Sequence, residues 1–92
     1  MDIERQQLNE LRRRGHNLKP VVLTGAAGLS ISVMEEIERA LNDHELIKVK
    51  LAGADKKERE EMTAEILAAT GAIAVQNIGR IALLYRENPT TA

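Results

Sequence analysis

The sequence of 92 residues predicts a two-layer α/β fold with the element order α-β-α-β-α-β-β and a four-stranded mixed sheet. Three observations predict it: apolar residues recur at helical spacing in three segments, short apolar or alternating segments follow each of them, and a Gly-Arg pair divides the last apolar stretch. Strands separated by a helix favour parallel crossovers, and a final hairpin adds an antiparallel strand. We expect one domain over residues 1–86 and a flexible tail over residues 87–92.

The first helix is indicated by Ile3, Leu8 and Leu11, which lie near helical spacing, and it should end by Gly15 with three arginines in its last turns. Residues 20–24 are short and rich in residues that favour strands, so they predict the first strand.

The second helix is indicated by apolar recurrence at three and four residues. Ser32 and Glu35 have the spacing of a capping box, and Ser30 is a competing N-cap. The residues that recur are Val33, Ile37, Ala40, Leu41 and His44.

The second strand, residues 46–51, alternates between apolar and basic residues. Its lysines, Lys48 and Lys50, should share one face of the sheet. Part of that face is therefore solvated, and the helices should pack mainly on the other face. The residues expected to face the helices are Ile47, Val49 and Leu51.

The third helix should start at Asp55, which has capping-box-like spacing to Glu58, and stop at Gly71. Its expected inner face consists of Met62, Ile66 and Ala69. Residues 72–78 and 81–85 then predict two strands joined by Gly79-Arg80, a glycine-first pair that suits a tight hairpin turn and places Arg80 at its tip.

Composition limits the possible functions. With no Phe, Trp or Cys and a single aromatic residue, Tyr85, the core must be aliphatic, and a disulfide framework or thiolate zinc site is excluded. The N-terminus lacks the apolar segment of a secretory signal, and no apolar run approaches the ~20 residues that span a bilayer, so we expect a cytoplasmic protein without membrane association. The net charge of −1 hides a segregation, with +2 on residues 1–24 and −4 on residues 25–70.

Catalytic chemistry is poorly supported by the sequence. His16 and His44 fall near the ends of expected helices, where the helix dipole favours a cation. No residues pair convincingly as nucleophile and base, so we expect no catalytic residue, no metal and no cofactor. The carboxylates of the expected helices are explained by a solvated surface: Glu35, Glu36, Glu38, Glu58, Glu60, Glu61 and Glu65.

The four residues Gly25-Ala26-Ala27-Gly28 lie between the first strand and the second helix. They lack the Lys-Ser/Thr pair of a Walker loop and the third glycine of a dinucleotide-binding fingerprint. Backbone N–H groups exposed at a helix N-terminus attract anions, and KH domains use a GxxG loop to clamp a nucleic-acid backbone. The loop is therefore either an anion-contact element or only a tight turn.

Several motifs in fixed order closely resemble the bacterial YhbY group, stand-alone members of the CRM (chloroplast RNA splicing and ribosome maturation) domain family. They are Leu18-Lys-Pro, the GxxG, "HELIKVK", "TGA", and "IGR" followed by "LYR". The resemblance runs from about residue 8 to residue 86. It implies a fold similar to the C-terminal domain of translation initiation factor three, a GxxG loop that contacts RNA, and association with precursors of the large ribosomal subunit.

One departure from the family concerns the loop itself, because family loops often hold a lysine and a polar residue where this chain has two alanines. We therefore expect neighbouring cations to supply phosphate contacts, and the scarcity of aromatic residues favours recognition of phosphates and RNA shape over stacked bases. The expected RNA-contacting residues are Gly25, Ala26, Ala27, Gly28, Lys19, Lys48, Lys50 and Arg80, with Arg12 to Arg14 as outer support.

The leading hypothesis is a non-enzymatic, monomeric RNA-binding protein that assists assembly of the large ribosomal subunit. Two alternatives remain at this point. One is a protein-interaction module that docks assembly factors through its acidic helical side, and the other is a small phosphate- or nucleotide-binding enzyme.

Overall fold

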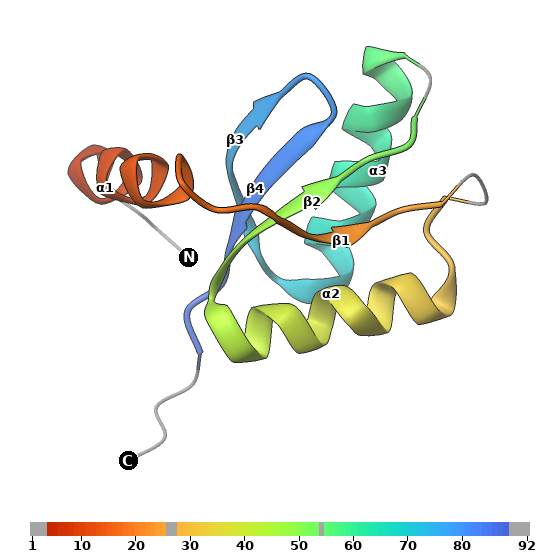
Figure 1. The fold of residues 1–92 in the computed structure, drawn as a ribbon, viewed down its shortest axis with the longest axis horizontal. Helices are drawn as coiled ribbons and strands as arrows, with labels where there is room; N and C mark the ends of the chain where they lie inside the picture. Colours follow the sequence, from red (N-terminus) through yellow and green to blue (C-terminus); the bar gives the residue numbers. More distant parts are fainter. Residues whose placement is uncertain (1–3, 26–27, 54, 89–92) are drawn as a thin grey trace.

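The computed structural model describes residues 4–25, 28–53 and 55–88 (Figure 1). The α/β class and the predicted order of elements are confirmed. The elements are α1 (Arg5–Gly15), β1 (Pro20–Leu23), α2 (Ile31–His44), β2 (Leu46–Lys50), α3 (Lys56–Thr70), β3 (Ile73–Ile78) and β4 (Ile81–Tyr85).

The four strands form one mixed sheet in the order β1-β2-β4-β3. β1 and β2 are parallel, and β4 is antiparallel to both β2 and β3. The hairpin strand β4 therefore inserts between β2 and β3, so the crossover through α3 leads to the far edge of the sheet. This arrangement places the end of β2 directly beside the start of β4.

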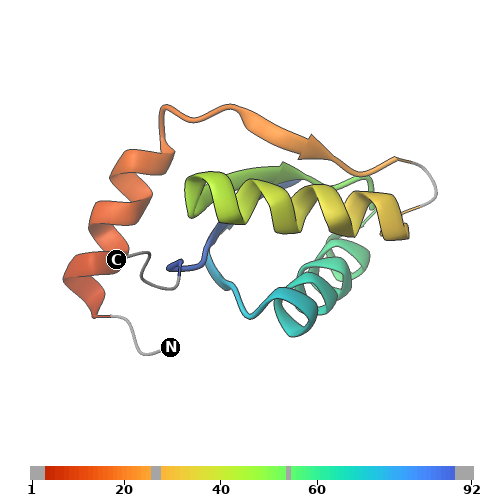
Figure 2. The ribbon, with the colours of Figure 1, turned by 90° about the horizontal axis from the view of Figure 1, so that it is seen from below.

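The main core lies between the sheet and the helix pair α2 and α3, which lie close together in both views (Figures 1 and 2). As predicted, Ile47, Val49 and Leu51 face these helices. The buried residues of this core are Val22, Ile37, Leu41, Ile47, Val49, Leu51, Ile66, Ala72, Ala82 and Leu84. The core is wholly aliphatic, as the composition requires.

Helix α1 packs on the opposite face of the sheet and covers only one end of it. The close approach depends on Gly15, because a Cβ atom at this position would lie 2.5 Å from Leu83 Cδ2. Lys48 is half-buried and Lys50 is exposed, so the remainder of this face is open, as expected. The buried residues under α1 are Leu11, Leu46, Val75, Leu83 and Tyr85, so the single aromatic side chain belongs to the interior.

The helix ends show which capping signals the fold uses. Ser30 caps α2, since its hydroxyl oxygen accepts a hydrogen bond from the Val33 N–H (3.2 Å), so a start at Ser32 is wrong. Asp55 caps α3 as predicted, accepting from the Glu58 N–H (2.8 Å). Gly71 ends α3 with φ +76°, the left-handed conformation that favours glycine.

The inner face of α3 is rotated relative to the prediction. Ile66 is buried and Met62 is half-buried, but Ala69 is exposed and Thr63 is buried in its place. Thr63 tolerates burial because its hydroxyl donates to the Arg59 carbonyl (3.0 Å), which satisfies the polar group within the helix. The expected inner position of Ala69 is therefore wrong, since apolar spacing alone does not identify a threonine that satisfies itself.

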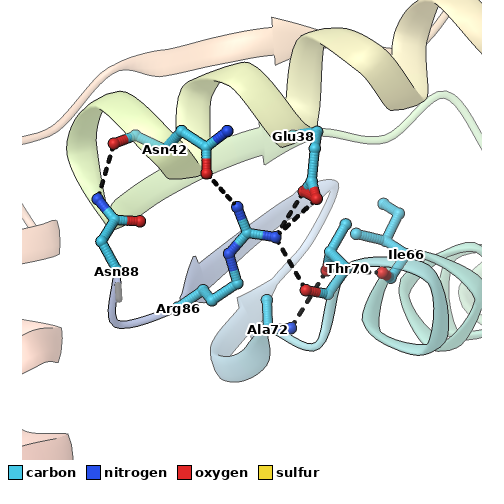
Figure 3. A network of polar contacts seen from close by, with 7 residues as sticks. All are labelled: Glu38, Asn42, Ile66, Thr70, Ala72, Arg86 and Asn88. Carbon is cyan, nitrogen blue, oxygen red and sulfur yellow. Dashed lines mark hydrogen bonds and ion pairs between the residues drawn. The ribbon is translucent and has the colours of Figure 1, made fainter. Parts of the chain in front are cut away.

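The chain after β4 is bonded to α2 and α3 through a set of hydrogen bonds and an ion pair that we call the Arg86 network (Figure 3). Arg86 Nη1 donates to Glu38 Oε1 and to the Thr70 carbonyl, both at 2.9 Å, and Nη2 donates to Asn42 Oδ1 (2.7 Å). Asn88, which falls within the expected tail, donates from Nδ2 to the Asn42 carbonyl (2.7 Å). Residues 89–92 lie outside the described residues. The network joins β4, α2 and α3 at one corner of the fold.

Candidate nucleic-acid interface

The glycine loop joins the end of β1 to the start of α2, as predicted, and closes on itself. The Gly28 N–H donates to the Gly25 carbonyl (2.9 Å), and the Ser30 N–H donates to the Gly28 carbonyl (3.1 Å). Gly25 is exposed and Gly28 is half-buried. Ala26 and Ala27 lie outside the described residues. The ends of the loop therefore form a tight turn directly before the capped N-terminus of α2.

The two glycines have different structural requirements. Gly28 has φ +79°, a backbone conformation that side-chain-bearing residues rarely adopt. Gly25 has no positive φ, and a Cβ atom there would meet nothing within 4 Å. The fold thus explains a glycine at position 28 but not at position 25, where the missing side chain leaves the backbone open to a ligand.

The end of β2 and the β3–β4 turn lie at the same end of the sheet as this loop (Figure 1). They carry two of the predicted cations, Lys50 and Arg80. The Thr24 N–H donates to the Lys50 carbonyl (3.0 Å), which places the end of β2 beside the start of the loop. The Leu51 N–H donates to the Arg80 carbonyl (2.7 Å), which places the β3–β4 turn beside the end of β2. This turn contains the predicted pair, with Gly79 at φ +57°.

The other two predicted cations lie farther from the loop. Lys48 is two residues before Lys50 on the same face of β2 and pairs in register with Pro20. Lys19 directly precedes β1, whereas the loop follows β1, so Lys19 lies at the opposite end of this strand. The structure therefore groups Lys50 and Arg80 with the loop. Lys48 lies farther from the loop on the same face of β2, and Lys19 lies at the opposite end of β1.

The open face also carries apolar side chains that the sequence reasoning did not include. Leu23 pairs in register with Lys50 and is 63% exposed, and Ile78 pairs with Ile81 and is 65% exposed. A shallow cavity of about 190 Å³ lies among His16, Lys48, Gln76, Ile78, Ile81 and Leu83. The alternation in β1 could have indicated Leu23, but the place of Ile78 depends on the strand order.

The partners of the charged groups distinguish structural cations from available ones. Within the described residues, the ion pairs are Arg13–Glu10, Lys56–Glu60 and Arg86–Glu38. The predicted contact residues Lys19, Lys48, Lys50 and Arg80 are in none of these pairs. They are therefore available to an external anion. The same part of the chain holds no group of three His, Cys, Asp or Glu residues that could bind a metal ion.

The site is a glycine turn at a capped helix start, beside cations that are unpaired within the described residues, and such an arrangement can attract an anion. None of the helices described here is long and apolar enough to span a membrane. The chain belongs to the CRS1/YhbY (CRM) domain family, whose family model matches residues 3–86. The resemblance drawn from the motifs is confirmed.

Similar proteins support this assignment over nearly the whole chain. A protein of Pseudomonas aeruginosa named a probable RNA-binding protein is 46% identical over 89 residues, covering 97% of this chain and 86% of that protein. An RNA-binding protein of Haemophilus influenzae is 47% identical over 83 residues, covering 90% of this chain and 84% of that protein. The solution structure of a Staphylococcus aureus protein, described as a candidate RNA-binding protein, superposes with a TM-score of 0.84 at 27% identity, covering 99% of this chain and 95% of that one.

Proposed function

We propose that this protein binds RNA of large ribosomal subunit precursors and assists their assembly, as a non-enzymatic cytoplasmic monomer. The observation that carries the proposal is the position of the Gly25–Gly28 turn beside Lys50 and Arg80, neither of which has an ion-pair partner among the described residues. The names of the relatives in Pseudomonas and Haemophilus support RNA as the ligand.

In the proposed contact, the backbone of the loop approaches the phosphate and neighbouring side chains supply positive charge. Because the Gly28 N–H is already bonded to the Gly25 carbonyl, close approach of a phosphate is assigned to Gly25 and to the backbone of Ala26 and Ala27. Lys50 and Arg80 supply charge beside it, and Lys48 extends the contact along the open face. Lys19 belongs to the proposed surface as a more distant contact at the other end of β1.

The direct test is the double variant Ala26→Asp with Ala27→Asp, measured for binding to transcribed large-subunit precursor RNA. Two carboxylates beside a phosphate would repel it and obstruct the backbone, so affinity should fall at least about tenfold, or ~1.4 kcal/mol. Ala26→Lys, which restores a charge common in the family, should strengthen binding.

The matched control carries the same two changes on α3, Ala68→Asp with Ala69→Asp, where both residues are exposed. It changes the net charge equally but lies on the helical side of the molecule, so RNA affinity should change far less. If the loop variant folds normally and binds as tightly as the parent, the GxxG is only a turn and the proposed site is wrong.

The ribosomal part of the proposal is tested by crosslinking in cells followed by sequencing of the bound RNA. Enrichment on large-subunit rRNA precursors is expected. Enrichment spread over messenger RNA, with none on large-subunit rRNA, would remove the ribosomal assignment while leaving RNA binding in place. A co-purified mononucleotide or a measurable phosphohydrolase activity would instead support the enzyme alternative.

One observation favours a second function, docking of a protein partner on the acidic helical side. A groove between α2 and α3 is lined mainly by apolar residues and by Glu35 and Glu38, and one of its apolar lining residues, Ile31, is 82% exposed. The two helices carry eight carboxylates and four Lys or Arg residues. This surface fits a basic partner, and co-purification that survives complete RNase digestion would support it.

A further inference from the structure

A separate cavity of about 550 Å³ lies between the end of α1, the start of β1 and the end of α2. Its apolar lining consists of Leu46 and Ile47, which are buried, and Leu18 and Val21, which are 38% and 51% exposed. The volume is within the range of about 300–1,000 Å³ typical of small-ligand pockets. Among the described residues, none that lines this cavity belongs to the Gly25–Gly28 turn.

The polar part of the cavity is cationic. Arg14, Lys19 and His44 line it, and no carboxylate of the described residues does. None of these three residues is in an ion pair within the described part of the chain. A ligand that fills this cavity therefore needs an apolar body and a negative charge.

The three arginines at the end of α1 are not equivalent. Arg12 donates from Nε to the Val75 carbonyl (3.3 Å), and Arg13 is paired with Glu10. Arg14 lines the cavity and has no such partner among the described residues. The structure thus separates Arg14, with its guanidinium available to a ligand, from the two neighbours that are occupied within the molecule.

We propose that this cavity binds one unpaired nucleotide of the bound RNA. The base would lie against Leu18 and Val21, above the buried Leu46 and Ile47, and its phosphate would contact Arg14 and Lys19. Unpaired bases are commonly splayed from RNA into protein pockets, and a guanidinium can both stack on a base and pair with a phosphate. The proposal rests on the proposed RNA-binding function.

Position favours RNA over an acidic peptide as the occupant. The cavity lies at the start of β1, and the glycine turn lies at its end. Gly25 follows Lys19 by six positions, or about 20 Å along an extended chain. One single-stranded RNA can reach both sites, whereas an acidic peptide would be a second, separate ligand. The cavity also provides a base contact in a protein whose open face has no aromatic platform.

The test compares a fluorescein-labelled oligouridylate of about 10 nucleotides, within the usual site size of single-strand binders, with the abasic ribose-phosphate chain of the same length. The parent should bind oligouridylate at least about fivefold more tightly, or ~1 kcal/mol, because only a chain with bases can fill the apolar part of the cavity. Val21→Asp, which places a carboxylate in the cavity wall, should abolish this preference.

The matched control is Leu23→Asp, the same kind of change two residues along β1, outside the cavity. It should lower the affinity for both probes equally and so retain the preference for the chain with bases. If Val21→Asp does not fold, Leu18→Ala, a milder change in the cavity wall, takes its place and should reduce the preference. Folding is checked for each variant by its urea midpoint.

The results separate this proposal from the function on which it rests. The nucleotide pocket is overturned if the preference for oligouridylate persists in folded Val21→Asp or is absent from the parent. In either case, an equal loss of affinity for both probes in the Ala26→Asp, Ala27→Asp variant still supports RNA binding at the loop. A parent that binds neither probe nor precursor RNA overturns both proposals. Loss of the preference in Val21→Asp but not in Leu23→Asp supports the pocket whatever the loop variant does.

Discussion

Arg80 and Arg86 flank the same strand, β4, and have opposite surroundings. Arg86 is 16% exposed and donates to Glu38, Asn42 and the Thr70 carbonyl, so its charge and its donors are used within the fold. Arg80 is exposed in the turn beside the glycine loop and is in no ion pair of the described residues. Internal partners, rather than residue type, therefore decide whether an arginine stabilises the fold or is available to an external ligand.

The largest expected effect is on stability at Arg86. Arg86→Ala should lower the free energy of unfolding by about 2–3 kcal/mol, because it leaves Glu38 and a half-buried carbonyl without their donor. The loss should be below that of a fully buried pair, since Glu38 is 47% exposed and water can replace part of the interaction. Urea denaturation measures it, with Arg80→Ala as control. Equal stability of the two variants would contradict the comparison.

Substitutions of the two loop glycines should have different effects, one on stability and the other on RNA affinity. Gly28→Ala should cost about 1–2 kcal/mol, because alanine is strained at φ +79°. Gly25→Ala should leave the urea midpoint unchanged but reduce RNA affinity severalfold, since the added methyl group enters the space proposed for the phosphate. Full RNA affinity in folded Gly25→Ala would show that nothing approaches the backbone at this position.

Salt dependence should distinguish free cations from paired ones. RNA affinity should fall steeply with salt, and Arg80→Ala or Lys50→Ala should each reduce the log–log slope by about 0.7, the value for one phosphate contact to a single strand. Arg13→Ala is the comparison variant, because Arg13, expected from the sequence only as outer support, is engaged by Glu10 and should change the slope less. An unchanged slope in all three variants would place the RNA elsewhere.

The smallest expected effect is the titration of Tyr85, next to Arg86. Burial raises its pKa above the ordinary value of 10.0, with additional contributions from the negative charges of Glu45 and Glu87. The folded state therefore favours the neutral phenol: this contribution to stability is complete below pH 10.0 and is lost as the pH rises through the raised pKa. Since the chain has one tyrosine and no tryptophan, ultraviolet absorbance follows it directly, and a midpoint at or below 10.0 would contradict burial.

Local signals in the sequence determined most of the elements. Alternation in β2 separated Ile47 and Val49 from Lys48 and Lys50, and Gly71 and Gly79 marked a helix stop and a hairpin turn, because these features depend on the backbone period and on φ alone. Family motifs likewise identified the CRM domain, since their order along the chain is itself sequence information.

Only the tertiary structure decided which of these residues meet. The insertion of β4 between β2 and β3 brings Arg80 beside Lys50, and the crossing of α1 over the sheet forms a cavity with Arg14 and Lys19 at one end of β1. It also buries Thr63 rather than Ala69 on the inner face of α3 and brings Arg86 to its internal partners. The physical reason is that local periodicity fixes the face on which a residue lies within its own element, whereas its neighbours depend on long-range strand order and helix packing.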